Sequence, residues 1–361
     1  MKYQEEYRDP AISRRILENI KKVSKRQVRL MEVCGTHTVS IFRSGIGTVL
    51  PDTISLLSGP GCPVCVTTQK EIDTFIEIAK RDGVIVVTFG DVMRVPGSSS
   101  SLQRERAEGR DIRIVYSTRD ALKIAEKNPD KKVVFLGVGF ETTAPSVAAS
   151  ILSASRTGLD NFLVFSAHKL VPPALVALME NHDVDINGFI LPGHVSVIIG
   201  TRAYLPFFEQ YQVPCVISGF ETADLLQAIY TLVGQFEKGK PELKNAYRRA
   251  VTFKGNGKAQ KIMGEVFERI DTAWRGLGTI KESGLGIKEK FGNHDAEKAF
   301  EIEVPESEAP KSCACGEILT GIKIPPECPL YKKACTPVEP VGPCMVSSEG
   351  TCAAYYRYYG D

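Results

Sequence analysis

The chain has 361 residues, of which 43% are hydrophobic and 24% charged, and its formal net charge is +2 at pH 7. These values are ordinary for a globular protein, and the length suits two or three domains. The near-neutral charge gives no reason to expect a nucleic acid or an anionic membrane as a partner. No stretch approaches the roughly 20 apolar residues that span a bilayer, and the charged segment 1–9 lacks the apolar run of a signal peptide, so a cytoplasmic location is expected.

Predicted strands and helices alternate along most of the chain, judged from apolar runs and from apolar residues at helical spacing. In the first third we expect a helix over 12–23, strands over 28–33 and 53–57, a helix over 67–82, a strand over 84–89, a short charged helix and a strand over 112–116. In the middle third we expect helices over 120–126, 146–155, 172–179 and 224–236 and strands over 133–136, 162–165 and 188–191. Two further helices are expected over 243–250 and 258–274.

Repeated strand–helix alternation is typical of parallel sheets covered by helices on both faces. The sequence therefore predicts an α/β protein with two Rossmann-like parallel-sheet domains, residues 1–118 and 119–238, that face each other across a cleft. Residues 239–361 are expected to form a helical connector and a small irregular C-terminal domain.

A six-residue pattern occurs twice. Gly-Phe-Glu-Thr-Thr-Ala at 139–144 returns as Gly-Phe-Glu-Thr-Ala-Asp at 219–224, each time after an apolar strand and at the start of a helix. This suggests two related strand–turn–helix units, and Glu141 and Glu221 are expected to stabilise the first turns of those helices. The first copy also suggests a dinucleotide-binding turn, but Thr142 occupies the third glycine position of that fingerprint. A tight strand-to-helix turn is the alternative.

Two short cysteine segments carry the chemistry expected in the first third of the chain. Residues 34–38 (Cys-Gly-Thr-His-Thr) and 58–65 (Ser-Gly-Pro-Gly-Cys-Pro-Val-Cys) each follow a predicted strand and are expected to form loops. Ligands of parallel α/β sheets bind outside the carboxyl ends of the strands. Three thiols and one imidazole are therefore expected to converge in one crevice.

The individual residues of these segments have both functional and structural readings. Cys62 and Cys65 precede a helix whose partial positive charge favours thiolates, which are nucleophiles and soft metal ligands. Cys34 could be a small buried residue, but its association with His37 and with the later cysteine pair favours a functional role. His37 fits a ligand or proton donor and equally a residue that caps a backbone group.

Three other residues have weaker or purely structural readings. His194 follows the strand expected over 188–191 and is a weaker site candidate, and Asp91 follows the strand over 84–89 and is weaker still. Cys215 lies inside an apolar strand and is predicted to be a core residue.

The C-terminal tail is rich in cysteine and proline and has almost no helical period, so a metal centre is the expected staple of this segment. In a reducing compartment, so many cysteines favour metal or redox chemistry over structural disulfides. Four thiolates would hold an iron–sulfur cluster, and the short CxxC pairs of zinc ribbons are missing from the tail sequence, which favours a cluster over zinc. The tail cysteines are Cys313, Cys315, Cys328, Cys335, Cys344 and Cys352.

Five motifs resemble those of the HypD family of [NiFe]-hydrogenase maturation factors, and the resemblance spans essentially the whole chain. They are residues 34–38, 58–65, 139–145 (Gly-Phe-Glu-Thr-Thr-Ala-Pro), 192–196 (Pro-Gly-His-Val-Ser) and 343–350 (Pro-Cys-Met-Val-Ser-Ser-Glu-Gly). The resemblance implies a scaffold on which iron with two cyanides and one carbon monoxide is built before delivery to the hydrogenase large subunit.

The resemblance also implies partners and residue roles. Proteins like this bind a small HypC-type chaperone and receive cyanide from a HypE-type donor, which carries it as a thiocyanate. By that similarity Cys34 matches the iron-binding cysteine, assisted by a cysteine of the chaperone, and Cys62 and Cys65 match the essential CxxC of the iron site. The matches to the [4Fe-4S] cluster ligands are Cys313, Cys328, Cys335 and Cys352.

Cys315 and Cys344 are the remaining tail pair, and in some members of the family the equivalent residues form a disulfide beside the cluster. Cyanide release from a thiocyanate takes two electrons, whereas a single cluster normally moves one at a time, and a dithiol pair can store two. An electron relay from the tail through Cys62 and Cys65 to the iron is therefore expected. The alternative is a free-standing thiol–disulfide oxidoreductase that uses the CxxC pair and has a zinc-stapled tail.

Overall fold

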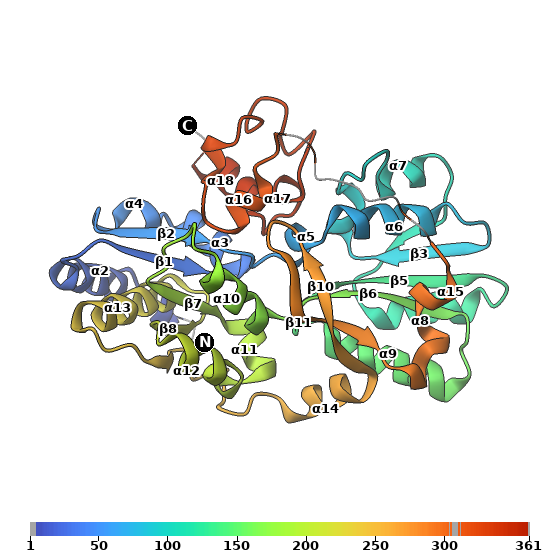
Figure 1. Ribbon diagram of the computed structural model, residues 1–361, viewed down its shortest axis with the longest axis horizontal. Coiled ribbons are helices and arrows are strands. Elements are labelled where there is room, and N and C mark those ends of the chain that lie inside the picture. Colours follow the sequence, from blue (N-terminus) through green and yellow to red (C-terminus); the bar gives the residue numbers. More distant parts are fainter. Residues whose placement is uncertain (1–4, 303, 305–309, 311, 360–361) are drawn as a thin grey trace.

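The computed structural model describes residues 5–302, 304, 310 and 312–359. It contains two parallel sheets flanked by helices, an antiparallel hairpin between them and a cysteine-rich tail at the top of the view in Figure 1. The predicted fold class, α/β with two Rossmann-like parallel sheets, is confirmed. Part of the polar segment 288–310 lies outside the described residues.

The first sheet, sheet A, is entirely parallel and has the strand order β2-β1-β7-β8-β9. Its strands are β1 (Val28–Glu32), β2 (Ile54–Ser58), β7 (Gly188–Pro192), β8 (Cys215–Ser218) and β9 (Leu243–Asn245). The helices of this half are α1 (Glu5–Arg8), α2 (Pro10–Val23), α3 (Gly35–Ser44), α4 (Ile46–Val49), α11 (Gly193–Ile199), α12 (Leu205–Tyr211) and α13 (Thr222–Lys238). Cys215 is fully buried in β8, which confirms the prediction that it is a core residue.

The second sheet, sheet B, is also parallel and has the order β4-β3-β5-β6. Its strands are β3 (Val84–Thr88), β4 (Ile112–Ile114), β5 (Lys132–Gly139) and β6 (Phe162–His168). The helices of this half are α6 (Gln69–Ala79), α7 (Leu102–Ala107), α8 (Thr118–Lys127), α9 (Ala144–Thr157) and α15 (Ala296–Ala299). Every residue of β3 is buried, as its continuous apolar sequence predicts.

The strand pairing crosses the division expected at residue 118. Strands β3 and β4 precede that residue but pair with β5 and β6, and strands β7 and β8 follow it but join β1. The chain therefore passes between the sheets after β2, again after β6 through α10 (Val171–Glu180), and again after β9 through α14 (Gly257–Val266).

The helix predicted over 243–250 is wrong, and the helix predicted over 258–274 is confirmed only as far as residue 266. The first region contains β9, and the second is α14 followed by the hairpin of β10 (Phe267–Trp274) and β11 (Gly278–Ile287). Apolar residues four apart, such as Ile270 and Trp274, also fall on one face of a strand, because four is a multiple of the strand period. Gly276 and Gly278 have φ of +81° and +70°, which suits a tight turn between strands and not a helix.

The remaining elements are short. A single turn of helix, α5 (Pro63–Val66), follows sheet A, and the tail contains α16 (Cys315–Leu319), α17 (Pro343–Val346) and α18 (Thr351–Tyr358). The 3₁₀ turns are η1 (Gly90–Arg94), η2 (Thr201–Tyr204), η3 (Glu289–His294) and η4 (Pro325–Glu327). One hydrophobic cluster includes Cys65, Phe189 of β7, Leu136 of β5 and Cys344 of the tail, so both halves and the tail share a core. Within the described residues, no helix combines the length and apolar character of a membrane span.

Candidate functional site

Three of the sequence motifs lie at the carboxyl ends of neighbouring strands of sheet A. Cys34 follows β1, the CxxC turn (residues 62–65) follows β2, and His194 follows β7, and β1 lies between the other two strands. The sequence predicts a loop after Cys34, but the structure has a helix there: α3 begins at Gly35, and Cys34 is its N-cap. Likewise His194 lies in the first turn of α11.

The backbones of the first two motifs are in direct contact. The amide N–H of Gly35 donates to the carbonyl oxygen of Gly61 at 2.8 Å. A Cβ atom on Gly61 would lie 2.1 Å from the backbone nitrogen of Cys34. Only glycine fits at this position, and the contact fixes the start of the CxxC turn against Cys34.

Cys34 opens onto a cavity of about 420 Å³ between the two halves of the molecule. Sheet A contributes the ends of its strands, and the turn after β5 of sheet B contributes the opposite wall. The tail adds a carboxylate, Glu349. The residues that carry the argument are Cys34, Gly61, Pro63, Phe140, Thr142, Thr143, His194 and Glu349. A crevice therefore exists at the predicted place, but of the three thiols and one imidazole expected in it only Cys34 lines it; Cys62, Cys65 and His37 do not.

Two carboxyl groups lie near Cys34, the buried Glu32 and the partly buried Glu349. The carboxylate of Glu32 accepts hydrogen bonds from the Cys34 amide at 2.8 Å and from the Thr38 hydroxyl at 2.5 Å, and burial raises the pKa of Glu32 to about 7. Glu349 accepts from the Thr36 hydroxyl at 2.7 Å, and burial also raises its pKa. Burial, opposed by the nearby backbone N–H groups, raises the pKa of Cys34 to about 12. The free protein therefore holds Cys34 as a thiol.

The two candidate histidines both contact Phe220. The His37 ring is 4.9 Å from the Phe220 ring, and the His194 ring stacks on Phe220 at 3.9 Å. His37 is fully buried and its Nε2–H donates to the Gly219 carbonyl at 3.0 Å. Its Nδ1 is buried and has no hydrogen-bond partner among the described residues. Burial lowers the pKa of His37 to about 4, so its imidazole is neutral.

The second copy of the repeated pattern thus contacts both histidines, through the Phe220 ring and the Gly219 carbonyl. Both copies follow a strand and precede a helix, as predicted. Glu221 is the N-cap of α13 and pairs with Arg8 at 2.8 Å, which confirms its helix-stabilising role. Glu141 instead accepts from the amide of Val171 at 3.0 Å and is buried. At the first copy, a Cβ on Gly139 would lie 1.8 Å from Thr143, so packing of the turn explains this glycine.

Cys62 and Cys65 are buried and joined by a disulfide. In this oxidised form neither sulfur is a thiolate, so neither can act as a metal ligand before reduction. The Cys65 sulfur lies 4.0 Å from the carbonyl oxygen of Pro343, the residue before Cys344. Among the described residues, no group of three or more His, Cys, Asp and Glu side chains is arranged to hold a metal ion.

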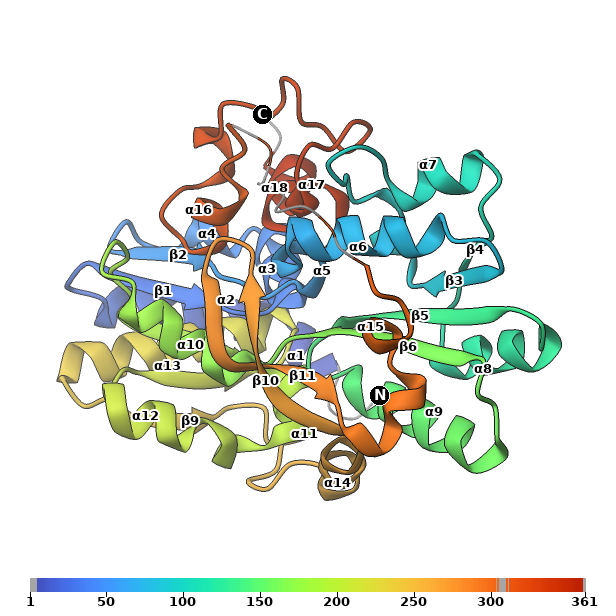
Figure 2. The same ribbon diagram turned by 45° about the vertical axis from the view of Figure 1, so that its right-hand side comes forward.

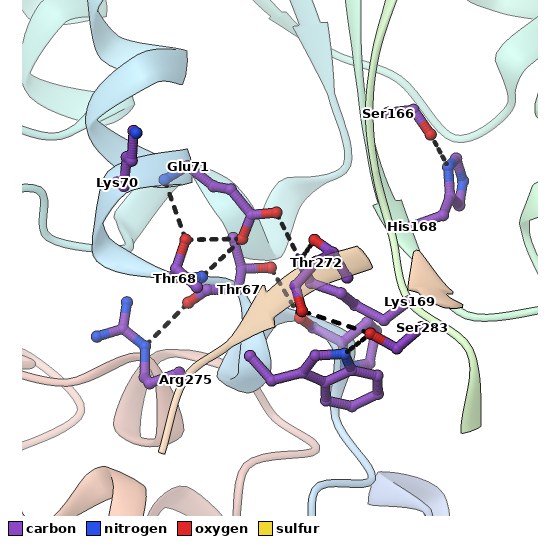
Figure 3. Close-up of polar contacts among 12 residues, drawn as sticks. Thr67, Thr68, Lys70, Glu71, Ser166, His168, Lys169, Thr272, Arg275 and Ser283 are labelled. Atoms are coloured by element: carbon purple, nitrogen blue, oxygen red, sulfur yellow. Dashed lines mark hydrogen bonds and ion pairs between the residues drawn. The ribbon is translucent and has the colours of Figure 1, made fainter. Parts of the chain in front are cut away.

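A buried ion pair supports the helix that follows the CxxC turn (Figure 3). Thr68 forms a capping box with Glu71 at the start of α6. The fully buried Lys169 donates to Glu71 at 2.6 Å and to the hydroxyl of Thr272 at 3.0 Å. The end of β6 and the hairpin are thereby tied to α6.

The six tail cysteines lie close together. The thiols of Cys313, Cys315, Cys344 and Cys352 are hydrogen-bonded in series, and Cys328 and Cys335 interact electrostatically with Cys352. Cysteine sulfurs are the type of ligand that an iron–sulfur cluster requires. The residues present therefore fit such a cluster in donor type, and the direct contact of Cys315 with Cys344 suits a dithiol pair.

Contacts from both halves hold the tail in place. Ser347 donates to Asp91 at 3.0 Å, and Arg94 donates to the carbonyl oxygens of Pro337 and Val346, each at 3.1 Å. Asp91, the weakest candidate from the sequence, thus contacts the tail and does not line the cavity. On the sheet A side, α18 packs on α3.

Comparison with known proteins identifies the family. The family model described as "HypD: Hydrogenase formation hypA family" matches residues 11–359. The chain belongs to the HypD family. It is 48% identical to the hydrogenase maturation factor HypD of Azotobacter vinelandii, over 99% of this chain and 97% of the relative. It is 43% identical to the Escherichia coli (strain K12) hydrogenase maturation factor HypD, over 99% of this chain and 98% of the relative.

A third relative extends the similarity to an archaeon. The putative hydrogenase expression/formation protein of Methanocaldococcus jannaschii is 45% identical, over 97% of this chain and 98% of the relative. The resemblance drawn from the five motifs is therefore confirmed. The HypD family is a family of hydrogenase maturation factors.

Sequence reasoning about this HypD chain missed Glu32, Glu349 and Phe220. A signal existed for Glu32, since a charged residue between the apolar Met31 and Val33, two residues before Cys34, is unusual. Glu349 lies inside a motif quoted for the family resemblance. Phe220 lies in the repeated pattern, but nothing in the sequence predicts that it contacts two histidines that follow other strands.

Proposed function

We propose that this chain is the scaffold and redox protein on which the iron with two cyanides and one carbon monoxide of [NiFe]-hydrogenase is assembled. Cys34 binds the iron, and a HypC-type chaperone supplies a second sulfur. A HypE-type protein donates cyanide, and the hydrogenase large subunit receives the finished group indirectly. The observation that carries the proposal is the position of Cys34. It lines a cavity between the halves, and its backbone contacts the CxxC turn.

The shape and lining of the cavity support an iron cargo with small ligands. A volume of about 420 Å³ is ample for one iron and diatomic groups. Val33, Phe140 and Val195 provide apolar walls, which suit an uncharged carbon monoxide, and Thr142 and His194 provide polar groups for cyanide nitrogen. Because the cavity opens between the halves, a chaperone cysteine could approach Cys34 from outside.

The redox part of the proposal follows from the balance of the cyanide transfer. A thiocyanate R–S–C≡N takes up two electrons and gives R–S⁻ and CN⁻, and oxidation of two thiols to a disulfide releases two electrons and two protons. Reduced Cys62 and Cys65 would supply those electrons and become the disulfide present in the structure. The dithiol of Cys315 and Cys344 would then regenerate them by exchange, because Cys65 lies beside the residue that precedes Cys344.

The tail is proposed to feed that dithiol. A [4Fe-4S] cluster bound by Cys313, Cys328, Cys335 and Cys352 would supply single electrons there. The gathering of the tail thiols supports this assignment, as does the hydrogen bond between Cys315 and Cys344.

The test is anaerobic purification of the chain with a HypC-type chaperone, followed by infrared spectroscopy. Bands of iron-bound cyanide and carbon monoxide are expected for the wild type and are expected to be lost in Cys34→Ser. Cys215→Ser is the matched control, since Cys215 is also a buried free cysteine but lies in the core of β8. Bands that persist in Cys34→Ser, or that disappear equally in Cys215→Ser, would contradict the proposal.

The disulfide of the CxxC turn favours one second candidate, a free-standing thiol–disulfide oxidoreductase. Such a protein would reduce generic disulfides in a reaction that needs Cys62 and Cys65 but not Cys34. Broad absorption of the purified protein at about 400 nm, typical of an iron–sulfur protein, would favour the scaffold function. A colourless zinc protein with full exchange activity after Cys34 substitution would favour the oxidoreductase.

A further inference from the structure

The position of the His194 ring at the cavity depends on one aromatic partner. His194 lines the cavity, and its ring stacks on Phe220 with centroids 3.9 Å apart and ring planes 25° apart. Among the described residues, this ring makes no hydrogen bond and no second ring contact. The direction in which the imidazole points is therefore set by Phe220.

Tyr247, which comes shortly after β9, holds Phe220 in turn. The two rings form an edge-to-face pair, with centroids 5.9 Å apart and planes 85° apart. A Cβ on Gly193, the residue before His194, would lie 3.0 Å from Cδ1 of Tyr247. A Cβ on Gly219, the residue before Phe220, would lie 2.7 Å from Cδ2 of Tyr247. The Tyr247 ring therefore packs against the start of both segments that carry the stack.

Arg249 fixes the position of Tyr247. Its guanidinium carbon lies 4.5 Å from the centre of the Tyr247 ring and 3.8 Å from the centre of the Tyr7 ring. The same guanidinium donates two hydrogen bonds to Asp224, at 2.8 and 2.5 Å. Asp224 is buried and accepts from the amide of Glu221 at the start of α13. A planar guanidinium can stack on rings and pair with a carboxylate through two bonds at once, which an ammonium cannot do.

The N-terminal segment completes this arrangement. Helix α13 packs on sheet A, and α1 and α2 both pack on α13 (Figure 2). Arg8 of α1 donates to both carboxylate oxygens of Glu221, each at 2.8 Å. Contacts between side chains therefore run from the first helix to the cavity. The members of this stack are Tyr7, Arg249, Tyr247, Phe220 and His194.

We infer that Tyr247 and Arg249 are positioning residues for the imidazole of His194, which they hold at the cavity through Phe220. The inference rests on the proposed function, in which His194 provides a polar group for a cyanide nitrogen. A hydrogen bond to a diatomic ligand requires one direction of the imidazole, and the stack restricts the ring to that direction. Neither Tyr247 nor Arg249 is among the described residues that line the cavity, so their effect on the cargo passes through the stack.

The first measurement reports the stack itself. NMR of ¹³C-labelled histidine rings in the full-length protein is recorded at pH 8, where the imidazole is neutral because burial lowers the pKa of His194. A ring that lies on the face of a phenylalanine has a ring-current shift, and the His194 signal is assigned by its loss in His194→Gln. The proteins compared are the wild type, Tyr247→Leu, Tyr247→Phe, Arg249→Lys and the control Arg248→Lys, which changes the exposed neighbour of Arg249.

The expected shifts follow from the strength of an aromatic pair. Tyr247→Leu should lower the ratio of stacked to unstacked His194 about fivefold, which corresponds to about 1 kcal/mol. Tyr247→Phe keeps the ring and should retain the wild-type shift, as should Arg248→Lys. Arg249→Lys keeps the charge but loses the planar stack and the paired bonds, so its shift should lie between those of Tyr247→Leu and the wild type.

The second measurement asks whether the stack acts through His194. In the complex with a HypC-type chaperone, Tyr247→Leu should move the infrared bands of iron-bound cyanide in the same direction as His194→Gln, without loss of total band intensity. Tyr247→Leu combined with His194→Gln should move them no further than His194→Gln alone, because the ring on which Tyr247 acts is then absent. Tyr247→Phe should leave the bands in place.

A purely structural role predicts other results. Tyr247→Leu and Arg249→Lys would then lower the Tm while the His194 signal and the cyanide bands stay at their wild-type positions. That outcome would overturn the inference, and so would additive band shifts in the double variant. If Tyr247→Leu does not fold, Arg249→Lys decides by the same two measurements.

Failure of the proposed function gives a separate signature. If the wild type purified with the chaperone shows no bands of iron-bound cyanide, the assignment of the iron cargo is wrong. The NMR measurement still tests the stack in that case, because it needs no cargo. A fivefold fall of the stacked ratio in Tyr247→Leu would support the positioning of His194, and an unchanged His194 signal would reject it.

Discussion

Substitution of Gly61 by alanine tests whether the contact between the Cys34 segment and the CxxC turn is essential. The added methyl carbon would lie 2.1 Å from the backbone nitrogen and 2.5 Å from the Cα of Cys34. These are backbone atoms of a segment that is also hydrogen-bonded to Gly61, so no flexible side chain can move aside. Overpacking of a tight site costs about 1–3 kcal/mol, and this geometry places Gly61→Ala near the upper value. Since about 1 kcal/mol shifts the Tm of a large domain by roughly 2 °C, we expect a fall of roughly 6 °C.

The assay pairs thermal unfolding with the infrared measurement on the chaperone complex. Gly234→Ala is the control, because Gly234 lies inside α13 and a Cβ there meets no atom within 4 Å. This control should gain roughly 0.5–1 kcal/mol, since alanine is the better helix former. Gly61→Ala should also lose the iron-bound bands, because the two segments must separate. A Gly61→Ala protein with unchanged Tm and full bands would refute the reasoning.

Three further predictions follow from buried groups. Lys169→Met leaves Glu71 without its partner and should lower the free energy of unfolding, measured with a chemical denaturant, by about 3 kcal/mol. Adding Glu71→Gln should recover part of this loss. The control Lys80→Met, which breaks an ion pair on the surface, should lower it by less than about 1 kcal/mol. Burial raises the pKa of Glu141 to about 7, so the folded state binds its proton more tightly and this stability falls as the pH rises from 4.5 to about 7. Glu141→Gln should flatten the dependence of Tm on pH in that window, and parallel profiles would contradict this. Cys344→Ser should leave the CxxC disulfide oxidised after anaerobic reduction of the tail, as read by alkylation and mass spectrometry.

The sequence was informative wherever a local pattern decides the structure. The strand β3 was predicted correctly because its apolar run is a local pattern. The hairpin of β10 and β11 was missed for the opposite reason. Residues four apart fall on one face of a helix and of a strand alike, and only the pairing of β10 with β11 distinguishes the two. Strand order is also set by pairing between distant segments, so the division at residue 118 did not follow the sheets.

The residues of the site also divide into those that a local pattern could predict and those that depend on contacts between distant segments. The rule that ligands gather at the carboxyl ends of parallel strands placed Cys34 at a cavity without knowledge of the strand order. It did not single out His194, the weaker candidate, which lines the same cavity, and it wrongly included His37. It could not place Glu349, which reaches the cavity from the far end of the chain.

The path of the chain decides which parts of the site can move independently. The CxxC turn lies where the chain leaves sheet A after β2 and enters sheet B through α6, so its two ends belong to different halves. On the sheet A side, Gly61 is fixed to Cys34 by backbone contacts, which set the distance from Cys34 to Cys62. On the other side, Arg275 holds the carbonyl oxygens that follow Cys65. The single turn of α5 therefore lies between an anchor on Cys34 and an anchor on the hairpin, so a displacement of either anchor would act directly on the CxxC turn.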